Sequence, residues 1–337
     1  MAKKTSALPV HHESTLPPQQ ILDLFKVVFH DELYEQDAEA LHRTIQTVKT
    51  DLYNRDYAAA FDDEDKRSAY CCRWSPPRAV AYASLFGYLK EVREIIQCKS
   101  SAIDDKLASL SLDESPHNGR PNIDSNILCI GGGAGGELVS IASIFTPSRD
   151  FSLKYSKTPQ KDDTSPKLNV HLVDIANWSH LVGSLDKGIS ENWLYDQSKN
   201  FNVTFEHKDI LGMTPKDLKL KNLNLITLLF TTNELFTEQK AASIRFFQNL
   251  NANCMTGCHL LIVESAGSFS HITVGTKKFP IQFLVDTLLL GKRGEERKGD
   301  WEIVDQSDSL WYRGNDEFDY QVKLENMRFF YRLYRKK

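Results

Sequence analysis

The hydrophobic positions divide the chain into a helical part and a sheet-like part. From Pro17 to Ile96, apolar residues recur three and four positions apart, as in Ile21–Phe29, which predicts amphipathic helices. Residues 100–125 are rich in Ser, Asp, Asn, Pro and Gly and indicate a linker. Farther on, short continuous apolar runs such as Leu225–Phe230 predict parallel strands that are covered on both faces.

The order of the predicted elements indicates the fold. Strands are expected at residues 127–130, 169–174, 203–209, 225–230, 260–264, 301–304 and 327–334. No helical spacing separates the last two strands, so they should form a β-hairpin. Five βα units followed by a hairpin are typical of class I methyltransferase topology, whereas a dehydrogenase more often continues with parallel units. We therefore predict an α/β fold: a class I methyltransferase Rossmann-like sheet that ends in a β-hairpin, with an N-terminal helical domain.

A glycine-rich turn is the strongest candidate for a binding site. Residues 127–138 read as a buried strand, a glycine turn and the start of an amphipathic helix. Gly131, Gly133 and Gly135 alternate along the turn, and with Gly132 they let the backbone bend sharply and approach a ligand closely. A helix N-terminus there suits an anionic or carboxylate-bearing ligand. The turn alone fits both a dinucleotide-binding domain and an S-adenosylmethionine (SAM) methyltransferase.

Two acids at the ends of later strands strengthen the case for a cofactor site. Asp174 ends the second strand, where a carboxylate usually accepts hydrogen bonds from ribose hydroxyls. Asp209 follows the third strand, and resemblance to class I methyltransferases implies that it faces the adenine amino group. With the residues that directly follow them, Ile175 and Ile210, they complete the predicted site. One such aspartate alone would be read as a solvated strand end, but two in this order favour binding.

Three motifs resemble a fungal family of SAM-dependent methyltransferases that make N3-methyluridine in 25S ribosomal RNA. They are Arg73–Tyr82, Cys129–Glu137 and Phe230–Phe236, within a resemblance that extends from Ser6 to Tyr334. It implies SAM as the cofactor, 25S rRNA or a pre-ribosomal particle as the partner, and an intracellular location in the cytoplasm, the nucleus or the nucleolus. One departure is Cys129, which stands where many class I enzymes carry an acid.

Polarity and helical periodicity indicate a division of the chain into three parts. Residues 1–16 are polar and predicted to be a disordered tail, residues 17–122 to form the N-terminal helical domain, and residues 123–337 the SAM-dependent methyltransferase domain. No signal-peptide apolar region follows Met1 and no apolar run is long enough to cross a membrane, so we expect no membrane association.

The segment after the fourth strand narrows the expected chemistry. Thr231–Glu234 lacks the Asp/Asn-Pro-Pro-aromatic motif of enzymes that methylate exocyclic amines, and it lacks the Pro-Cys pair of C5 methylation. The Lys-Asp-Lys-Glu set of ribose 2′-O enzymes has no clear counterpart either. A ring imide such as uridine N3 is compatible, with Asn233 orienting the imide edge and Glu234 accepting its proton. The alternative is that Glu234 only caps or packs the following helix.

The helical part contributes one further candidate. Ser75 is expected to cap a helix that Pro76 opens, with Arg73 and Arg78 flanking its entry. Either guanidinium could hold a phosphate or the SAM carboxylate. The family resemblance favours such a role, and on that basis we assign Arg78 to the cofactor site. Both could instead pair with acids of the other domain.

Composition changes this picture only in part. Of the 337 residues 41% are hydrophobic and 26% charged, which is ordinary for a globular protein, and the net charge is −4. RNA contact must therefore come from local patches: either residues 292, 293, 297 and 298, or Arg328, Arg332, Arg335, Lys336 and Lys337. Tyr331 and Tyr334 could stack on bases there, although packing on the sheet is the favoured interpretation.

The cysteines and the remaining alternatives complete the predictions. The six cysteines show no paired metal spacing, so we expect free thiols and no metal. The fold leaves open a class I methyltransferase that acts on a protein or small molecule, or a non-catalytic SAM- or RNA-binding module. The sequence does not indicate the oligomeric state.

Overall fold

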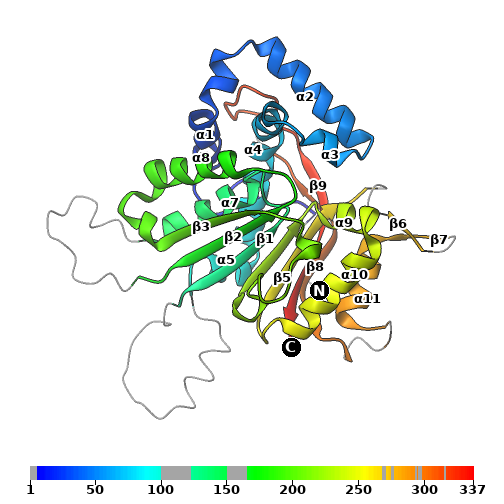
Figure 1. The fold of residues 1–337 in the computed structure, drawn as a ribbon. Helices are drawn as coiled ribbons and strands as arrows, with labels where there is room; N and C mark the ends of the chain where they lie inside the picture. The colour runs from blue at the N-terminus through cyan, green and yellow to red at the C-terminus, as the bar shows by residue number, and fades with distance from the viewer. Residues whose placement is uncertain are drawn as a thin grey trace, which may run out of the picture.

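A seven-stranded mixed sheet organises the molecule (Figure 1). The computed structural model describes residues 6–99, 123–149, 165–267, 271–274, 277–292, 294, 298–314 and 316–337. The strands of the sheet are β1 (Ser125–Ile130), β2 (Leu168–Asp174), β3 (Phe201–His207), β4 (Leu225–Leu229), β5 (His259–Ser265), β8 (Trp301–Tyr312) and β9 (Met327–Lys336). They lie in the order β3-β2-β1-β4-β5-β9-β8. The first five run parallel and β9 runs antiparallel to both of its neighbours, which confirms the predicted sheet with its terminal hairpin.

Helices cover both faces of this sheet. The N-terminal helices are α1 (Pro18–Val28), α2 (Ala38–Tyr53), α3 (Tyr57–Ala60), α4 (Glu64–Tyr88) and α5 (Lys90–Ile96). Those that follow strands are α7 (Gly136–Phe145), α8 (Ser179–Ile189), α9 (Thr232–Glu238), α10 (Lys240–Asn253) and α11 (Ile281–Leu290). A small separate hairpin is formed by β6 (His271–Val274) and β7 (Lys277–Pro280). None of the helices in the described part of the chain has the length and apolarity needed to cross a membrane.

The sheet separates two apolar cores, and the alternation of side chains along β1 illustrates how. Ile127 and Cys129 face the core shared with α1, α4, α7 and α8, while Leu128 and Ile130 face the core shared with α10 and α11. Figure 1 shows these two sets of helices on opposite sides of the sheet. The N-terminal helices therefore pack directly on the sheet. The predicted linker to the sheet lies almost entirely outside the described residues.

The predicted helix start at Ser75 is wrong, because α4 runs without interruption through both prolines. It begins at Glu64, where the Asp63 side chain accepts a hydrogen bond from the Lys66 N–H (2.7 Å). Pro76 has no N–H and leaves the Cys72 carbonyl without its helical partner, and the Tyr320 hydroxyl donates to that carbonyl instead (2.9 Å). A partner supplied from the loop between β8 and β9 thus lets the helix continue.

Three further predictions differ from the structure. Residues 6–16 follow an ordered path where we expected a disordered tail: Ala7 pairs with Trp311, so this segment supplies hydrogen bonds to the edge strand β8. Five βα units imply an α-helix after the third strand, but β3 is connected to β4 by short 3₁₀ turns, at Ile210–Gly212 and Leu220–Asn222. The strand predicted at 301–304 is much longer, because β8 pairs with β9 over most of its length.

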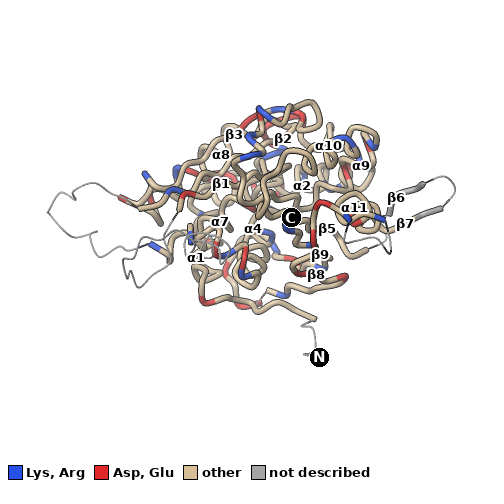
Figure 2. The backbone as a smooth tube through the Cα atoms, turned by 90° about the horizontal axis from the view of Figure 1, so that it is seen from below, with Lys and Arg blue, Asp and Glu red and all other residues tan. Residues whose placement is uncertain are grey.

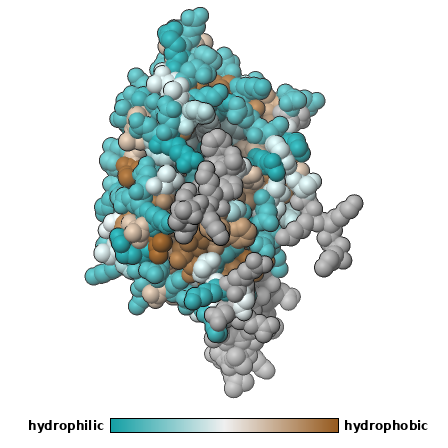
Figure 3. Space-filling model, turned by 90° about the vertical axis from the view of Figure 1, so that its right-hand side faces the viewer, coloured by the Kyte–Doolittle hydropathy of each residue, from teal (hydrophilic) through white to brown (hydrophobic). Residues whose placement is uncertain are grey.

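The surface is mixed in charge and has an apolar area on one face. Figure 2 shows Lys and Arg interspersed with Asp and Glu along the backbone. Figure 3 shows apolar surface in the middle of the face on which α11 lies, and the exposed Phe279 and Phe283 belong to β7 and α11 on this side. All six cysteines are buried and free, as predicted.

Candidate functional site

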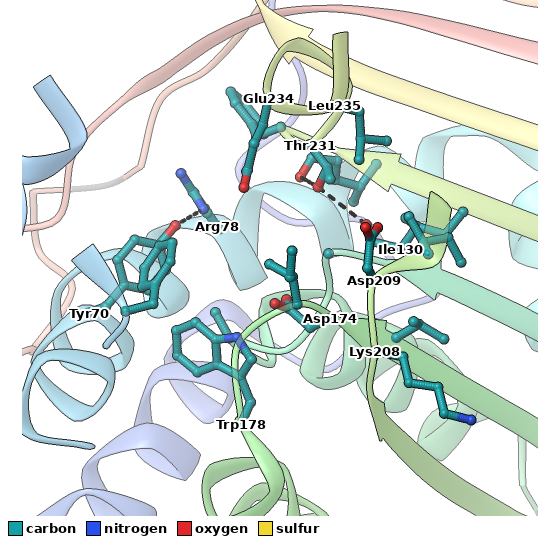
Figure 4. Close-up of a pocket in the computed structure, with 18 residues that line it drawn as sticks. Tyr70, Arg78, Ile130, Asp174, Trp178, Lys208, Asp209, Thr231, Glu234 and Leu235 are labelled. Carbon is teal, nitrogen blue, oxygen red and sulfur yellow. Dashed lines mark hydrogen bonds between the residues drawn. The ribbon is translucent and has the colours of Figure 1, made fainter. Parts of the chain in front are cut away.

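The predicted site residues converge on one cavity at the carboxyl ends of β1, β2 and β4 (Figure 4). This is where the strand order reverses, the usual ligand position in an open α/β sheet. Predicted residues on its wall are Arg78, Gly131, Asp174, Ile175, Asp209, Ile210 and Glu234. Gly132, Gly133, Gly135 and Asn233 lie beside it. The cavity measures about 100 Å³, smaller than the ~300 Å³ at which ligand pockets begin, so it must widen to admit a nucleoside cofactor.

Close packing explains the glycine turn. Gly131 has φ +71°, and a Cβ there would lie 2.3 Å from the Thr231 hydroxyl oxygen. At Gly133 a Cβ would lie 2.0 Å from Cδ1 of Trp178, whose indole forms part of the cavity wall. The turn is therefore held between a threonine and a tryptophan. Sequence reasoning missed Trp178, since an isolated aromatic residue before a helix carries no ligand-binding signal.

Backbone hydrogen bonds fix the Asp174 carboxylate at the end of β2. One oxygen accepts from the Gly133 N–H and the other from the Ala176 N–H, both at 3.0 Å. Burial raises the pKa of Asp174, and these two N–H groups oppose that rise because they stabilise the charged form. Asp209 is held similarly, since its side chain caps a 3₁₀ turn by accepting from the Leu211 N–H (2.9 Å).

Helix α4, together with Phe61 just after α3, provides an aromatic and cationic wall opposite the strand ends. Arg78 donates to the Tyr70 hydroxyl, and its guanidinium lies 5.4 Å from the Tyr70 ring and 5.2 Å from that of Phe230. Within the described residues Arg78 forms no ion pair, so its remaining donors are available in the cavity. Phe230 has φ +62°, a strained conformation for a non-glycine residue that is held at the turn from β4 to α9.

Arg73 behaves differently from Arg78. It forms an ion pair with Glu325 of the loop between β8 and β9 and lies 5.6 Å from the Trp74 ring. Of the two flanking arginines only Arg78 therefore faces the cavity, and pairing with an acid is the correct interpretation for Arg73.

Glu234 projects into the cavity from the first turn of α9 (Figure 4). Burial, followed by the charges of Asp174, Glu238 and Glu264, raises the pKa of Glu234 to about 8. No hydrogen-bond partner satisfies its carboxylate within the part of the chain that the structure describes. Figure 4 shows the carboxylate directed toward Arg78.

A second acid, which sequence reasoning missed, positions this helix. Glu264 at the end of β5 is buried, and its carboxylate accepts from the Asn233 N–H (3.1 Å) and from its neighbour Ser265 (3.0 Å). Burial raises the pKa of Glu264, while these hydrogen bonds lower it. The start of α9 is therefore tied to β5. The only signal for this role was an acid at a strand end.

A third buried acid lies beneath the glycine turn. A Cβ at Gly132 would lie 2.8 Å from an Oε atom of Glu137 and 3.0 Å from the Cys129 Cβ. Burial raises the pKa of Glu137 to about 8, and one of its oxygens has no partner in the described residues. Cys129 stands where many class I enzymes carry an acid, and in the structure the carboxyl group of Glu137 lies beside it.

Most of the predicted basic tail is neutralised within the protein. Arg332 pairs with Asp308 (2.5 Å), Arg335 with Glu302 (2.5 Å) and Lys336 with Asp300 (3.4 Å). Tyr331 and Tyr334 are buried in the two cores, which confirms that they pack on the sheet. Positions 293 and 297 of the second predicted patch lie outside the described residues.

Comparison with known proteins decides the family. The family model described as "Putative SAM-dependent methyltransferase" matches residues 25–335. The 25S rRNA (uridine(2843)-N(3))-methyltransferase of Saccharomyces cerevisiae is 55% identical over 345 residues, which cover 98% of this chain and 89% of that protein. The chain belongs to the SAM-dependent methyltransferases. It is an enzyme of this family, its cofactor is SAM, and the strand order with its antiparallel end is the predicted class I sheet.

Solved structures resemble the methyltransferase more distantly. The mitomycin 7-O-methyltransferase is 12% identical and aligns over 97% of this chain and 74% of its own, with a TM-score of 0.37. The N-methyltransferase NodS of Bradyrhizobium japonicum is 13% identical over 64% of this chain and 86% of its own, with a TM-score of 0.33.

The hydrogen-bonding groups around the cavity fit the chemistry of SAM. Fixed carboxylates at Asp174 and Asp209 can accept from ribose hydroxyls and an adenine amino group, and the free donors of Arg78 suit a carboxylate. The exposed Ile175 offers an apolar surface beside them. Trp178 lies against the turn where a cofactor would approach it most closely, which explains the small volume of the cavity.

Proposed function

We propose that this methyltransferase transfers a methyl group from SAM to N3 of a uridine in large-subunit rRNA. The observation that carries the proposal is the 55% identity, over 98% of the chain, to the yeast enzyme named for that reaction. The site supports it, because the segment after β4 places a single carboxylate, Glu234, and no nucleophilic cysteine on the described wall of the cavity.

Glu234 is proposed as the general base. The imide nitrogen of uracil carries a proton and becomes nucleophilic only when that proton is removed. The Glu234 carboxylate accepts the N3 proton, directly or through water. Asn233, whose backbone Glu264 holds, orients the imide edge from the same turn of α9. Bound SAM supplies an electrophilic methyl group, so that N3 forms a bond to the methyl carbon while the bond from that carbon to sulfur breaks.

The raised pKa of Glu234 suits this role. A carboxylate whose pKa is about 8 is a far stronger base than one in bulk water, which lowers the barrier to removing a weakly acidic imide proton. The cost is that much of the enzyme carries Glu234 protonated at neutral pH. Activity should therefore increase as the pH rises toward and past about 8.

The cofactor residues are proposed as a set. Asp174 would accept from the ribose, Asp209 from the adenine amino group, and Ile175 and Ile210 would contact the adenine faces. The glycine turn, Gly131, Gly132, Gly133 and Gly135, would contact the methionine part, and Arg78 would hold its carboxylate.

We further propose that the partner is 25S rRNA or a pre-ribosomal particle and that the enzyme acts in the cytoplasm, the nucleus or both. The division into a helical domain (17–122) and a methyltransferase domain (123–337) remains a proposal. On this view the helical part completes the site, since Phe61, Tyr70 and Arg78 all come from it.

The test is methylation of defined RNA. Purified enzyme is incubated with SAM and with unmodified 25S rRNA transcribed in vitro, and the RNA is then digested and its nucleosides are separated by mass spectrometry. We expect 3-methyluridine with the wild-type enzyme and, at a SAM concentration near the wild-type Kd, much less with Asp174→Ala. Methylation of a nucleoside other than uridine would contradict the proposal. So would the absence of 3-methyluridine from both the naked RNA and pre-ribosomal particles, or methylation of a protein instead.

A further inference from the structure

Three side chains at one end of the terminal hairpin form a cationic cluster around an aromatic ring. Trp311 of β8 lies directly opposite Arg328 of β9. The Arg328 guanidinium lies 5.8 Å from the Trp311 ring centre, and the guanidinium of Arg313 lies 4.4 Å from it. Both arginines are exposed and Trp311 is half-buried. We call these three residues the Trp311 cluster.

The arginines of this cluster differ from the other cations of the hairpin. Arg332, Arg335 and Lys336 each pair with a carboxylate. In the described part of the chain neither Arg313 nor Arg328 forms an ion pair, and the one side-chain hydrogen bond of Arg328 goes to the Ser309 hydroxyl (2.9 Å). Two positive charges are therefore without an ion-pair partner among the described residues of a protein whose net charge is −4.

The cluster lies on the same side of the sheet as the candidate base. Glu264, which holds the start of α9, lies opposite Phe330 in the pairing of β5 with β9, so the two side chains share a face. Arg328 precedes Phe330 by two residues and therefore points to that face as well. It lies about 7 Å farther along the strand, beyond the carboxyl end of β5.

The backbone beneath the cluster is firmly held. The Trp311 N–H donates to the Ser6 carbonyl (3.1 Å), and the Trp311 carbonyl accepts from the Leu8 N–H (2.8 Å). In β9, Arg328 pairs with Trp311 across the sheet, and the Arg328 carbonyl accepts from the Ala266 N–H (3.3 Å). Trp311 and Arg328 are thus presented from a rigid platform, which reduces the entropy lost when they bind a partner.

We propose that the Trp311 cluster binds the backbone of single-stranded RNA next to the methylated nucleotide. The inference rests on the proposed function, because it names the surface on which that RNA substrate lies. Arg313 and Arg328 contact phosphate oxygens, and the Trp311 ring holds the guanidinium groups in place by cation–π contact. Arginines without an ion-pair partner among the described residues, on the sheet face that also carries Glu264, match the recognition of single-stranded RNA, in which guanidinium groups also stack on bases.

The experiment measures the binding of in vitro-transcribed 25S rRNA as a function of salt. The double variant Arg313→Ala/Arg328→Ala should reduce the slope of log affinity against log salt by about 1.4, the value for two lost phosphate contacts on a single strand. RNA affinity at low salt should fall on the order of ten-fold, and KM for the RNA should rise accordingly. Trp311→Leu should weaken binding in the same direction by less, because the arginines remain but are no longer held.

A matched control is present in the same hairpin. Arg335→Ala also removes a positive charge, but this arginine is paired with Glu302 at the other end of β9, so we expect an unchanged salt slope. SAM affinity, measured by titration calorimetry, should be the same in all variants. Equal slopes for wild type, the double variant and Arg335→Ala would overturn the proposal.

The outcomes separate this surface from the proposed function. If the wild type makes 3-methyluridine but the double variant shows the same KM and slope, the cluster does not bind RNA although the function stands. If the wild type makes none while the slopes still differ as expected, the cluster binds RNA and the function is wrong. If the double variant loses activity only on pre-ribosomal particles and binds naked RNA normally, the cluster contacts a protein and the proposal fails.

Discussion

Among the described residues, charged side chains are buried and unpaired at one end of the sheet, whereas at the other end they form ion pairs near the surface. At the cofactor end, Glu234, Glu264 and Glu137 are carboxyl groups without an ion-pair partner in the described residues, and burial raises the pKa of each. At the far end of the terminal hairpin, Arg335 with Glu302 and the neighbouring pairs neutralise one another near the surface. The sequence contains acids and bases in both places, so composition does not distinguish them.

The difference shows which charged groups lower the stability of the fold. Burying the charge of an unpaired acid is costly, so burial favours its protonated form, whereas a paired surface charge costs little and contributes little. Groups with strongly shifted pKa values in a cavity are candidates for function for this reason. The comparison therefore separates buried acids that are candidates for a role in binding or catalysis from ion pairs that only join surface strands. The predictions below test it.

The largest effect is expected at Glu234. Glu234→Gln keeps the shape and the hydrogen-bonding capacity of the side chain but removes the base, so kcat should fall by roughly 10²-fold or more with SAM affinity nearly unchanged. The wild-type rate should increase as the pH rises through about 8, where half of Glu234 is ionised, and the variant should lack that increase. Single-turnover methylation of 25S rRNA across pH 6–9 measures both. A variant that methylates at the wild-type rate would show that Glu234 only packs the helix.

A smaller effect is expected at the cofactor. Asp174→Ala should weaken SAM binding by about 1.5–3 kcal/mol, the scale of hydrogen bonds to a charged group. The variant also leaves the Gly133 N–H without the acceptor that holds the turn. Titration calorimetry measures the affinity, and Asp186→Ala, on the half-buried side of α8, is a control for loss of an acid outside the cavity. Equal affinity in wild type and a folded Asp174→Ala variant would remove Asp174 from the site.

How much of this site the sequence could reveal depends on the range of the interactions. The glycine turn, Asp174 and Asp209 follow directly from strand ends and local turn chemistry, and they were predicted. Trp178 and Glu264 could not be predicted in the same way, since each acts through a partner far away in the chain, Gly133 and Asn233.

The fold shows the same limit. Alternating and continuous apolar runs were enough to place the strands, because a strand's burial determines which of its own residues are apolar. The uninterrupted α4 was missed, because two prolines normally signal a helix start. The Tyr320 hydroxyl that makes the exception possible belongs to a loop remote in sequence. The pairing of residues 6–8 with β8 was missed for the same reason.

The unpaired acid should also influence stability. The pKa of Glu234 is about 8 in the folded enzyme and 4.5 in an unfolded chain, so the folded state binds the proton more tightly. Its contribution to stability is fully present below about pH 4.5 and is lost as the pH rises through 8. Glu234→Gln cannot ionise, and its Tm should exceed that of the wild type by about 2 °C or more at pH 9, with little difference at pH 5. Calorimetric melting at both pH values measures this, and a difference of the same size at both would rule out titration as the cause.

The smallest effect is expected where charges are paired near the surface. Arg335 and Glu302 are each more than a third exposed, so replacing Arg335 by Ala should change the free energy of unfolding by only about 0–1 kcal/mol. The change should shrink further in high salt, since screening weakens an exposed pair even in the wild type. Urea denaturation of Arg335→Ala, Glu302→Ala and the double variant gives the coupling energy of the pair. A coupling well above 1 kcal/mol would mean that this pair is as consequential as the unpaired acids, and the contrast between the two ends of the sheet would no longer hold.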